Sequence, residues 1–171
     1  MFDTAAKSLF VIAPHERPRR LWPPMESPEL EHIKQVWKVM QGNSPIYDFL
    51  LGNQIVTFIS ASRGYFMAHL TLNANHVNSR KTIHGSVTAT LVDWAGGLAI
   101  ATHGLEKSGA SVDIHITYIS TAVVGDTIVI EGTANKVGRS MAFTSVKITK
   151  LVDGGPGPII ATASHTKYIR Q

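Results

Sequence analysis

The stretch from Thr82 to Gly104 constrains the fold most, because it reads as one helix of about twenty residues that must be packed on most of its sides. Its residues are mainly Ala, Leu, Val, Thr, Ile and Gly, and Asp93 is its only acid. A helix that is apolar all round belongs in a protein interior. We therefore expect the rest of the chain to form a layer that wraps around this helix.

The remaining sequence is rich in strand patterns joined by short turns. A hairpin interrupted at Ser62–Gly64 precedes the helix, and four strand candidates follow it, over residues 110–120, 126–137, 140–151 and 158–169. Strands that follow one another through short turns pair antiparallel. The predicted fold class is α+β, with a long central helix wrapped by a curved antiparallel β-sheet.

The N-terminal part has a different character. Residues 1–28 contain five prolines, which predict an extended arm. A helix is expected next, with Ser27 as its N-cap, Pro28 in its first turn and apolar residues at helical spacing up to Met40. We expect two parts: residues 1–45 as a Pro-rich arm and helix, and residues 46–171 as the sheet domain. The arginine-rich, acid-poor arm resembles a mitochondrial transit peptide weakly, so the expected location is cytoplasmic or mitochondrial.

Composition narrows the function classes. The formal net charge is +4, and the basic residues are scattered along the 171 residues. Nucleic-acid binders concentrate their basic residues on one face, so we expect no nucleic-acid partner. A modest positive field suits a small anionic substrate, such as one that carries phosphates. The chain has no cysteine, which excludes disulfides, cysteine metal sites and a cysteine nucleophile. No apolar run reaches the roughly 18–20 residues of a membrane span.

Two features of the central segment point to chemistry. Asp93 has apolar neighbours on both sides in the sequence, and desolvation raises the pKa of a carboxyl group, which suits a general base. His84, Gly85 and Ser86 open the predicted helix, where backbone N–H groups and the positive end of the helix dipole are available to a developing oxyanion. Gly85 also lets a substrate approach the backbone closely.

These two features cannot meet within one helix. His84 and Asp93 are nine positions apart, which is about 13 Å along a helix axis and on opposite faces. A two-fold pairing of two chains would place Asp93 of one chain near His84 and Gly85 of the other. If both groups act together, the protein is a dimer with shared sites.

Five segments of the chain resemble the hotdog-fold acyl-CoA thioesterases, and among them the thioesterase superfamily member 2 group, which is related to the phenylacetic-acid-pathway thioesterases. They are NSRKTIHGSVTATLVDWAGGLAI, SVDIHITYIS, GDTIVIEG, MAFTSV and HTK. The resemblance covers about residues 50–169. It implies a hotdog thioesterase domain, hydrolysis of fatty (medium- or long-chain) or aryl acyl-CoA without a metal or other cofactor, and a dimer of dimers.

The resemblance also assigns roles to residues. Asp93 would activate water as a general base or act as a nucleophile, and the backbone N–H of Gly85 would polarise the thioester carbonyl. Asn78 would hold that carbonyl or the water, His84 would orient the loop, and Ser111 would position the water. For the CoA nucleotide we expect the basic turn over residues 135–140 and the HTK segment, with these contacts: Lys136, Gly138, Arg139, Ser140, His165 and Lys167.

The chain departs from the family pattern at two positions near this site. Ser86 stands where the family has a second glycine, and Lys81 stands in place of a usual glycine before Thr82. Ser86 is expected to cap the helix or to narrow the pocket. Trp94, beside the proposed base, is expected either to shape an acyl tunnel or to be part of the core.

Three other functions compete with hydrolysis of acyl-CoA. A hotdog hydratase uses an Asp and a His close together, usually as D-x-N-P-x-H, and this chain has no such stretch. A serine hydrolase lacks its G-x-S-x-G elbow here. The alternative that stays open is a non-catalytic module that binds or senses acyl-CoA, because Asp93, Asn78 and Ser111 would serve binding as well.

Overall fold

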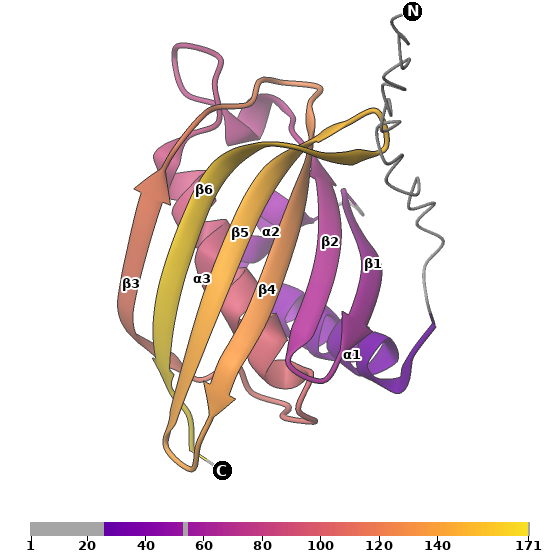
Figure 1. The fold of residues 1–171 in the computed structure, drawn as a ribbon, viewed down its shortest axis with the longest axis vertical. Helices are drawn as coiled ribbons and strands as arrows, with labels where there is room; N and C mark the ends of the chain where they lie inside the picture. Colours follow the sequence, from indigo (N-terminus) through magenta and orange to yellow (C-terminus); the bar gives the residue numbers. More distant parts are fainter. Residues whose placement is uncertain (1–25, 53–54, 171) are drawn as a thin grey trace, which may run out of the picture.

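The computed structural model describes residues 26–52 and 55–170. Its helices and strands follow in this order: α1 (Pro28–Asn43), α2 (Pro45–Leu51), β1 (Val56–Ser62), β2 (Tyr65–Thr71), the short 3₁₀ helix η1 (Ala74–His76), α3 (Gly85–Ala101), β3 (Ala110–Tyr118), β4 (Thr127–Val137), β5 (Met141–Val152) and β6 (Gly155–Tyr168). The strands form one antiparallel sheet in the order β1-β2-β4-β5-β6-β3. Helix α3 runs along the inner face of this curved sheet (Figure 1). The predicted α+β arrangement is confirmed.

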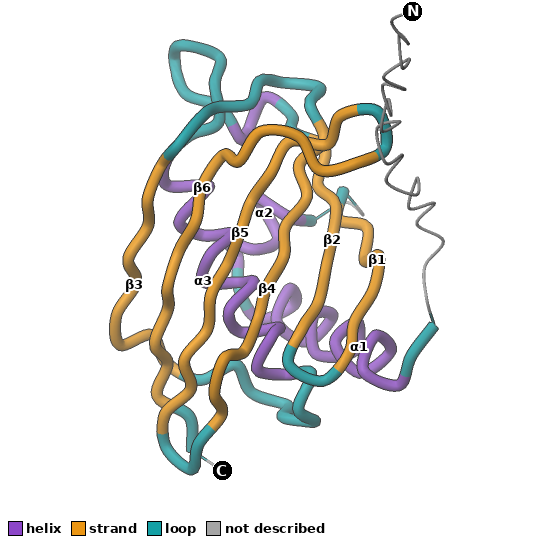
Figure 2. The backbone as a smooth tube through the Cα atoms, viewed as in Figure 1, coloured by secondary structure: helices purple, strands orange, loops and turns teal. Residues whose placement is uncertain are grey.

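Most expected elements occur within a few residues of their predicted bounds. The β1–β2 hairpin turns at Gly64, whose φ of +83° favours glycine. Helix α3 is shorter than predicted because His84, with an extended backbone, is its N-cap and Thr102 is its C-cap. Helix α2 was not expected. It starts at Pro45, and Figure 2 shows it as a separate short helix behind the sheet.

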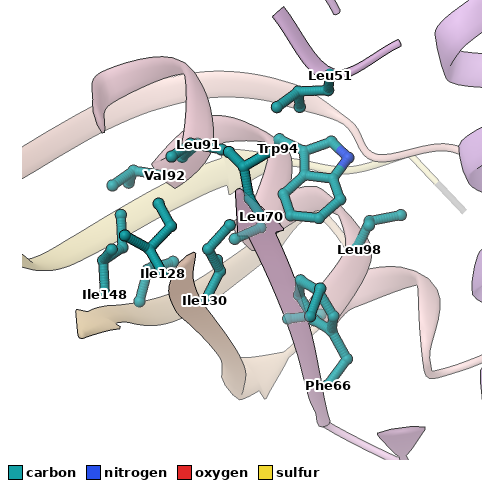
Figure 3. Packing of buried hydrophobic residues seen from close by; sticks show 14 of the residues in the cluster. Leu51, Phe66, Leu70, Leu91, Val92, Trp94, Leu98, Ile128, Ile130 and Ile148 are labelled. Atoms are coloured by element: carbon teal, nitrogen blue, oxygen red, sulfur yellow. The ribbon is translucent and has the colours of Figure 1, made fainter. Parts of the chain in front are cut away.

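The core forms between α3 and the inner face of the sheet. Trp94 is fully buried at its centre, with its ring 5.7 Å from that of Trp37 on α1 and 5.6 Å from that of Phe66 on β2. Figure 3 shows aliphatic side chains of β2, β4 and β5 around the same helix. Of the two expected roles for Trp94, the structure supports packing, since a fully buried indole inside this cluster is part of the core.

Helix α1 belongs to this same core. Ser27 caps it as predicted, since its Oγ accepts a hydrogen bond of 3.0 Å from the backbone N of Leu30. Leu30, Ile33, Val36 and Trp37 are buried in one cluster with α3. The expected boundary at residue 45 therefore does not separate two cores. The extended arm predicted for residues 1–28 lies mostly outside the described residues. No helix of the described residues is long and apolar enough to cross a membrane.

Strand β3 forms one edge of the sheet and is exposed along nearly its whole length. It pairs with β6 on one side, and no described residue pairs with its other side. Its exposed apolar side chains include Val112 and Tyr118, which are 58% and 56% accessible. An apolar edge strand with free backbone groups is a ready site for pairing with another chain.

Candidate active site

Asp93, in the middle of α3, is the centre of a polar cluster. Its Oδ1 accepts hydrogen bonds from Ser111 Oγ at 2.8 Å and from Lys167 Nζ at 2.7 Å. Its Oδ2 accepts a hydrogen bond from Tyr47 Oη at 2.8 Å. His165 Nε2 lies 3.0 Å from Ser111 Oγ and 3.6 Å from Asp93 Oδ1. The carboxylate is therefore bound by three donors that come from three different elements.

Strand geometry explains why β3 and β6 deliver these partners. Ser111 and Lys167 are directly opposite each other in the β3–β6 ladder. His165 and Lys167 are two positions apart, so both side chains point to the inner face of the sheet, toward α3. Gly96, one turn further along α3, leaves room for this arrangement, since a Cβ there would lie 2.7 Å from His165 Nδ1.

The electrostatics of Asp93 differ from the expectation. Burial raises the pKa of this carboxyl, but the charge of Lys167 and the hydrogen bonds from Lys167, Tyr47 and Ser111 outweigh it, so the net pKa is lowered. The expected rise was wrong because it considered only the apolar neighbours in the sequence. Asp93 is ionised at neutral pH, and 33% of its side chain is accessible.

His165 is fully buried beside this carboxylate. Burial lowers its pKa, and so does the neighbouring charge of Lys167, while Asp93 acts in the opposite direction. The imidazole is therefore neutral at neutral pH. The positive charge of the cluster is therefore that of Lys167, whose side chain is only 3% accessible.

The start of α3 forms a second polar group of residues. The Nδ1 atom of His84 accepts a hydrogen bond of 3.1 Å from the backbone N of Ser86 and lies 2.7 Å from Ser86 Oγ. The Ser86 hydroxyl is therefore engaged with the residue that caps the helix. Gly85 is the first residue of α3, and the N–H groups of a first helical turn have no partner within the helix. Its carbonyl accepts a hydrogen bond of 3.2 Å from Tyr118 Oη.

Asn78 organises the loop before this helix. Its Oδ1 accepts hydrogen bonds from the backbone N of Arg80 at 2.9 Å and of Thr82 at 3.3 Å. Lys81, between them, has a φ of +63°, in the left-handed region that favours glycine. The departure from glycine at this position therefore places a lysine in a strained backbone conformation.

The two groups of residues lie apart within one chain. Ser111 near the start of β3 contacts Asp93, whereas Tyr118 at the end of β3 contacts Gly85. The structure thus brings Ser111 to Asp93 as expected but does not bring Gly85, His84 or Asn78 there. A cavity of about 760 Å³ lies between α1 and β1, lined by Lys34, Trp37, Gln41, Leu51, Val56, Thr57 and Phe58, and Asp93 is not among its lining residues.

Comparison with known proteins identifies the family. The profile of the thioesterase superfamily matches residues 80–156. Human acyl-coenzyme A thioesterase 13 is 34% identical over 139 residues, which span 81% of this chain and 95% of the human protein. The chain belongs to the thioesterase superfamily.

Solved structures agree with this assignment. Zebrafish thioesterase superfamily member 2 superposes with a TM-score of 0.70 at 35% identity, over 81% of this chain and 96% of the zebrafish chain. A hypothetical thioesterase of Streptococcus pneumoniae, solved with coenzyme A, superposes with a TM-score of 0.61 at 22% identity, over 70% of this chain and 92% of that chain, and so shares the fold. The hotdog fold predicted from the sequence is confirmed, and the chain is a thioester hydrolase.

In this thioesterase, the turn expected to bind the nucleotide lies near the Asp93 cluster. Lys136, Arg139 and Ser140 are exposed around it, and neither cation forms a salt bridge with a described residue. The backbone N of Gly138 closes the turn onto the carbonyl of Met141 at 2.9 Å. The strand that leaves this turn pairs Ala142 with Lys167. The turn therefore lies only a few strand positions from Lys167, which contacts the Asp93 carboxylate, and at the same end of the sheet.

The side chains of His165 and Lys167 are buried, unlike the exposed cations of the turn. We expected both to hold the CoA phosphates, but their side chains are buried against Asp93. The structure places both in the carboxylate cluster, and their contact with CoA stays a prediction. The period of two in the HTK segment, which puts a cation and an imidazole on one inward face, was the signal available in the sequence.

Tyr47 is the functional-site residue that sequence reasoning missed. It reaches Asp93 from α2, an unexpected helix 46 positions earlier in the chain. No local pattern around Tyr47 signals this contact. Over the described ranges, no group of three or more His, Cys, Asp or Glu side chains is placed to hold a metal ion.

Proposed function

We propose that this thioesterase hydrolyses fatty (medium- or long-chain) or aryl acyl-CoA to the free acid and CoA, with Asp93 as the general base. The observation that carries the proposal is the state of Asp93: its carboxylate is ionised, one-third accessible and fixed by three donors. A carboxylate that is deprotonated, held in one orientation and partly accessible can accept a proton from a water molecule bound beside it.

The chemistry follows from the two groups of residues. Asp93 takes a proton from a water molecule, whose oxygen attacks the thioester carbonyl carbon. The carbonyl oxygen becomes an oxyanion, which the backbone N–H of Gly85 at the start of α3 stabilises. Collapse of this intermediate breaks the C–S bond, and CoA leaves as a thiolate that takes up the proton. Asp93 Oδ1 already accepts two hydrogen bonds and Oδ2 accepts one, so the free lone pair that the base role needs is on Oδ2.

The proposed reaction requires two copies of the chain. Gly85 and Asp93 are associated with opposite ends of β3 in one chain. Antiparallel pairing of β3 with β3 of a second copy would place the Ser111 end of one strand beside the Tyr118 end of the other. Asp93 of one subunit would then face Gly85 and Asn78 of its partner. The exposed apolar residues of β3 support this dimer, and a dimer of dimers is the proposed larger assembly.

The basic turn is proposed as the site for the CoA nucleotide. Lys136 and Arg139 are exposed cations without a protein carboxylate partner among the described residues, at the end of the sheet where Lys167 contacts Asp93. The streptococcal relative was solved with coenzyme A, which supports a CoA ester as the substrate class. Cations that are free of carboxylates suit phosphate groups.

The deciding experiment measures thiol release from a panel of acyl-CoA esters, from acetyl to palmitoyl and phenylacetyl. Asp93→Asn is expected to lower kcat by at least about a hundredfold with little change in KM, because it removes a group that acts in the transition state. Glu131→Gln is the matched control, since Glu131 on β4 is also paired with a lysine, Lys147, at 2.7 Å, and also accepts a hydrogen bond from a tyrosine, Tyr65. Binding of CoA esters without turnover by the unmodified protein would instead identify a non-catalytic binding module.

A further inference from the structure

Tyr47 makes a contact with the proposed base that no other described side chain duplicates. Its hydroxyl donates to Asp93 Oδ2 at 2.8 Å, while Ser111 and Lys167 both donate to Oδ1. A carboxylate oxygen offers two lone pairs. Oδ1 therefore has both of its sites filled, and Oδ2 keeps one site for a further donor, such as a water molecule.

The surroundings hold the Tyr47 ring in place. Its ring lies 6.0 Å from that of Trp37, edge to face at 64°, and Trp37 packs in turn on Trp94, the residue next to Asp93. The end of α2 is fixed as well, because the carbonyl of Leu50 lies 2.7 Å from Nε2 of the fully buried His76. A donor that is restrained in this way loses little freedom when it forms its hydrogen bond.

The phenol acts only as a donor to this carboxylate. Burial raises the pKa of Tyr47, and the negative charge of Asp93 and the hydrogen bond to it raise the pKa further. The hydroxyl is therefore protonated at neutral pH. Hydrogen bonds to an ionised acceptor are stronger than those between neutral groups.

We propose that Tyr47 is a positioning residue of the active site, whose hydroxyl fixes Oδ2 of Asp93 so that its remaining lone pair is directed at the attacking water. This role rests on the proposed function of Asp93 as the base. It differs from the role of Lys167, which supplies charge to the other oxygen. Tyr47 acts through Asp93 and does not itself contact the reacting carbonyl.

The other groups that face Asp93 can be named, so a change at Tyr47 is interpretable. From β6 these are the cation of Lys167 and the neutral imidazole of His165, and from β3 the uncharged hydroxyl of Ser111. Asp113 on β3 acts on His165 as a more distant negative charge. Tyr47→Phe removes one donor from Oδ2 and leaves every one of these charges in place.

The test compares Tyr47→Phe with the unmodified protein and with Tyr65→Phe. Tyr65, on β2, also donates a hydrogen bond from its hydroxyl to a carboxylate, that of Glu131 on β4, at 3.0 Å. Two readouts are needed: the titration of Asp93 followed by NMR of ¹³C-labelled aspartate side chains, and the pH profile of kcat/KM. Thermal unfolding shows that each variant is folded, and the phenylalanine ring retains the contact with Trp37.

The Tyr47→Phe change is expected to raise the pKa of Asp93 by about one unit, a tenfold shift in its protonation constant. The acid limb of kcat/KM should move upward with it, and kcat should fall about tenfold with KM nearly unchanged. Tyr65→Phe should alter neither readout. An Asp93 titration that is the same with and without the Tyr47 hydroxyl overturns the proposal.

The two readouts separate this proposal from the proposed function. If the unmodified protein turns over no acyl-CoA but the Asp93 titration still shifts in Tyr47→Phe, the positioning contact holds and the hydrolase mechanism fails. If turnover depends on Asp93 but the kcat/KM profile of Tyr47→Phe matches that of the unmodified protein, the mechanism holds and the role of Tyr47 is refuted.

Discussion

The ammonium group of Lys167 lies 2.7 Å from Oδ1 of Asp93 and is almost completely buried. The two residues are 74 positions apart, and the β3–β6 register brings them together through Ser111. A buried cation is stable only when a counter-charge accompanies it. The site therefore depends on the pair as a unit, and changes to either partner affect both the chemistry and the fold.

Lys167→Met is expected to make the free energy of unfolding depend less on pH in the acid range. Folding lowers the pKa of Asp93, so its stabilising contribution is complete above its ordinary value of 3.8 and is lost as pH falls through the lower pKa of the folded state. Without Lys167 that pKa rises, so the free energy of unfolding should decrease less between pH 5 and about pH 2. Urea unfolding at a series of pH values measures the difference.

The control for this change is Lys34→Met, which removes an exposed pair with Glu31 on α1. Such pairs contribute little to stability, so the pH dependence should match that of the unmodified protein. Equal acid dependence in Lys167→Met and the unmodified protein would show that Lys167 does not set the pKa of Asp93.

Gly96→Ala is expected to disturb the active site by displacing His165. A Cβ at Gly96 would lie 2.7 Å from His165 Nδ1 and 2.9 Å from Thr144 Oγ1, so the imidazole has to leave its present position beside Ser111 and Asp93. We expect a loss of about 1–3 kcal/mol in the free energy of unfolding and a lower kcat. Gly42→Ala is the control, because nothing lies within 4 Å of its Cβ and an alanine in α1 should stabilise by about 0.5 kcal/mol. Equal stability of the two variants would contradict the packing argument.

Lys81→Gly is expected to stabilise the loop before α3. Lys81 has a φ of +63°, which costs an L-residue about 1–2 kcal/mol and glycine almost nothing, while the freer unfolded chain of glycine offsets part of this gain. The expected net gain is about 0.5 kcal/mol, measured as a higher urea midpoint. Arg80→Gly, next to it at a φ outside that region, should destabilise by a similar amount. A loss of stability in both variants would show that Lys81 makes contacts that outweigh its strain.

The sequence predicted the fold better than the site, and the reason is the range over which each signal acts. Apolar composition marks α3, and alternation marks β3 to β6, because both patterns are local. Helix α2 has only seven residues, too few for a periodic signal. The pKa direction of Asp93 and the positions of His165 and Lys167 depend on strand register, which no single segment encodes. The site residues that were placed correctly relative to Asp93, such as Ser111, came from the family resemblance.

A complementation experiment tests whether the two ends of β3 meet across a dimer. Gly85→Pro removes the proposed oxyanion donor, since proline has no N–H, and the change suits the first position of a helix. His84 already has the extended backbone that a following proline requires. Gly85→Pro and Asp93→Asn should each be folded and inactive. Co-refolded in equal amounts, they should recover about a quarter of the activity, because half of the dimers are mixed and one of their two sites is intact.

The control mixes Asp93→Asn with the double variant Asp93→Asn/Gly85→Pro, in which no site has a base, and it should stay inactive. Native mass spectrometry of differently tagged chains establishes that mixed dimers form. Mixed dimers of the two single variants without activity would mean that Asp93 and Gly85 of different subunits do not serve one site. Recovered activity would explain the position of Asp93, because its distance from the start of its own helix is then spanned by a second chain.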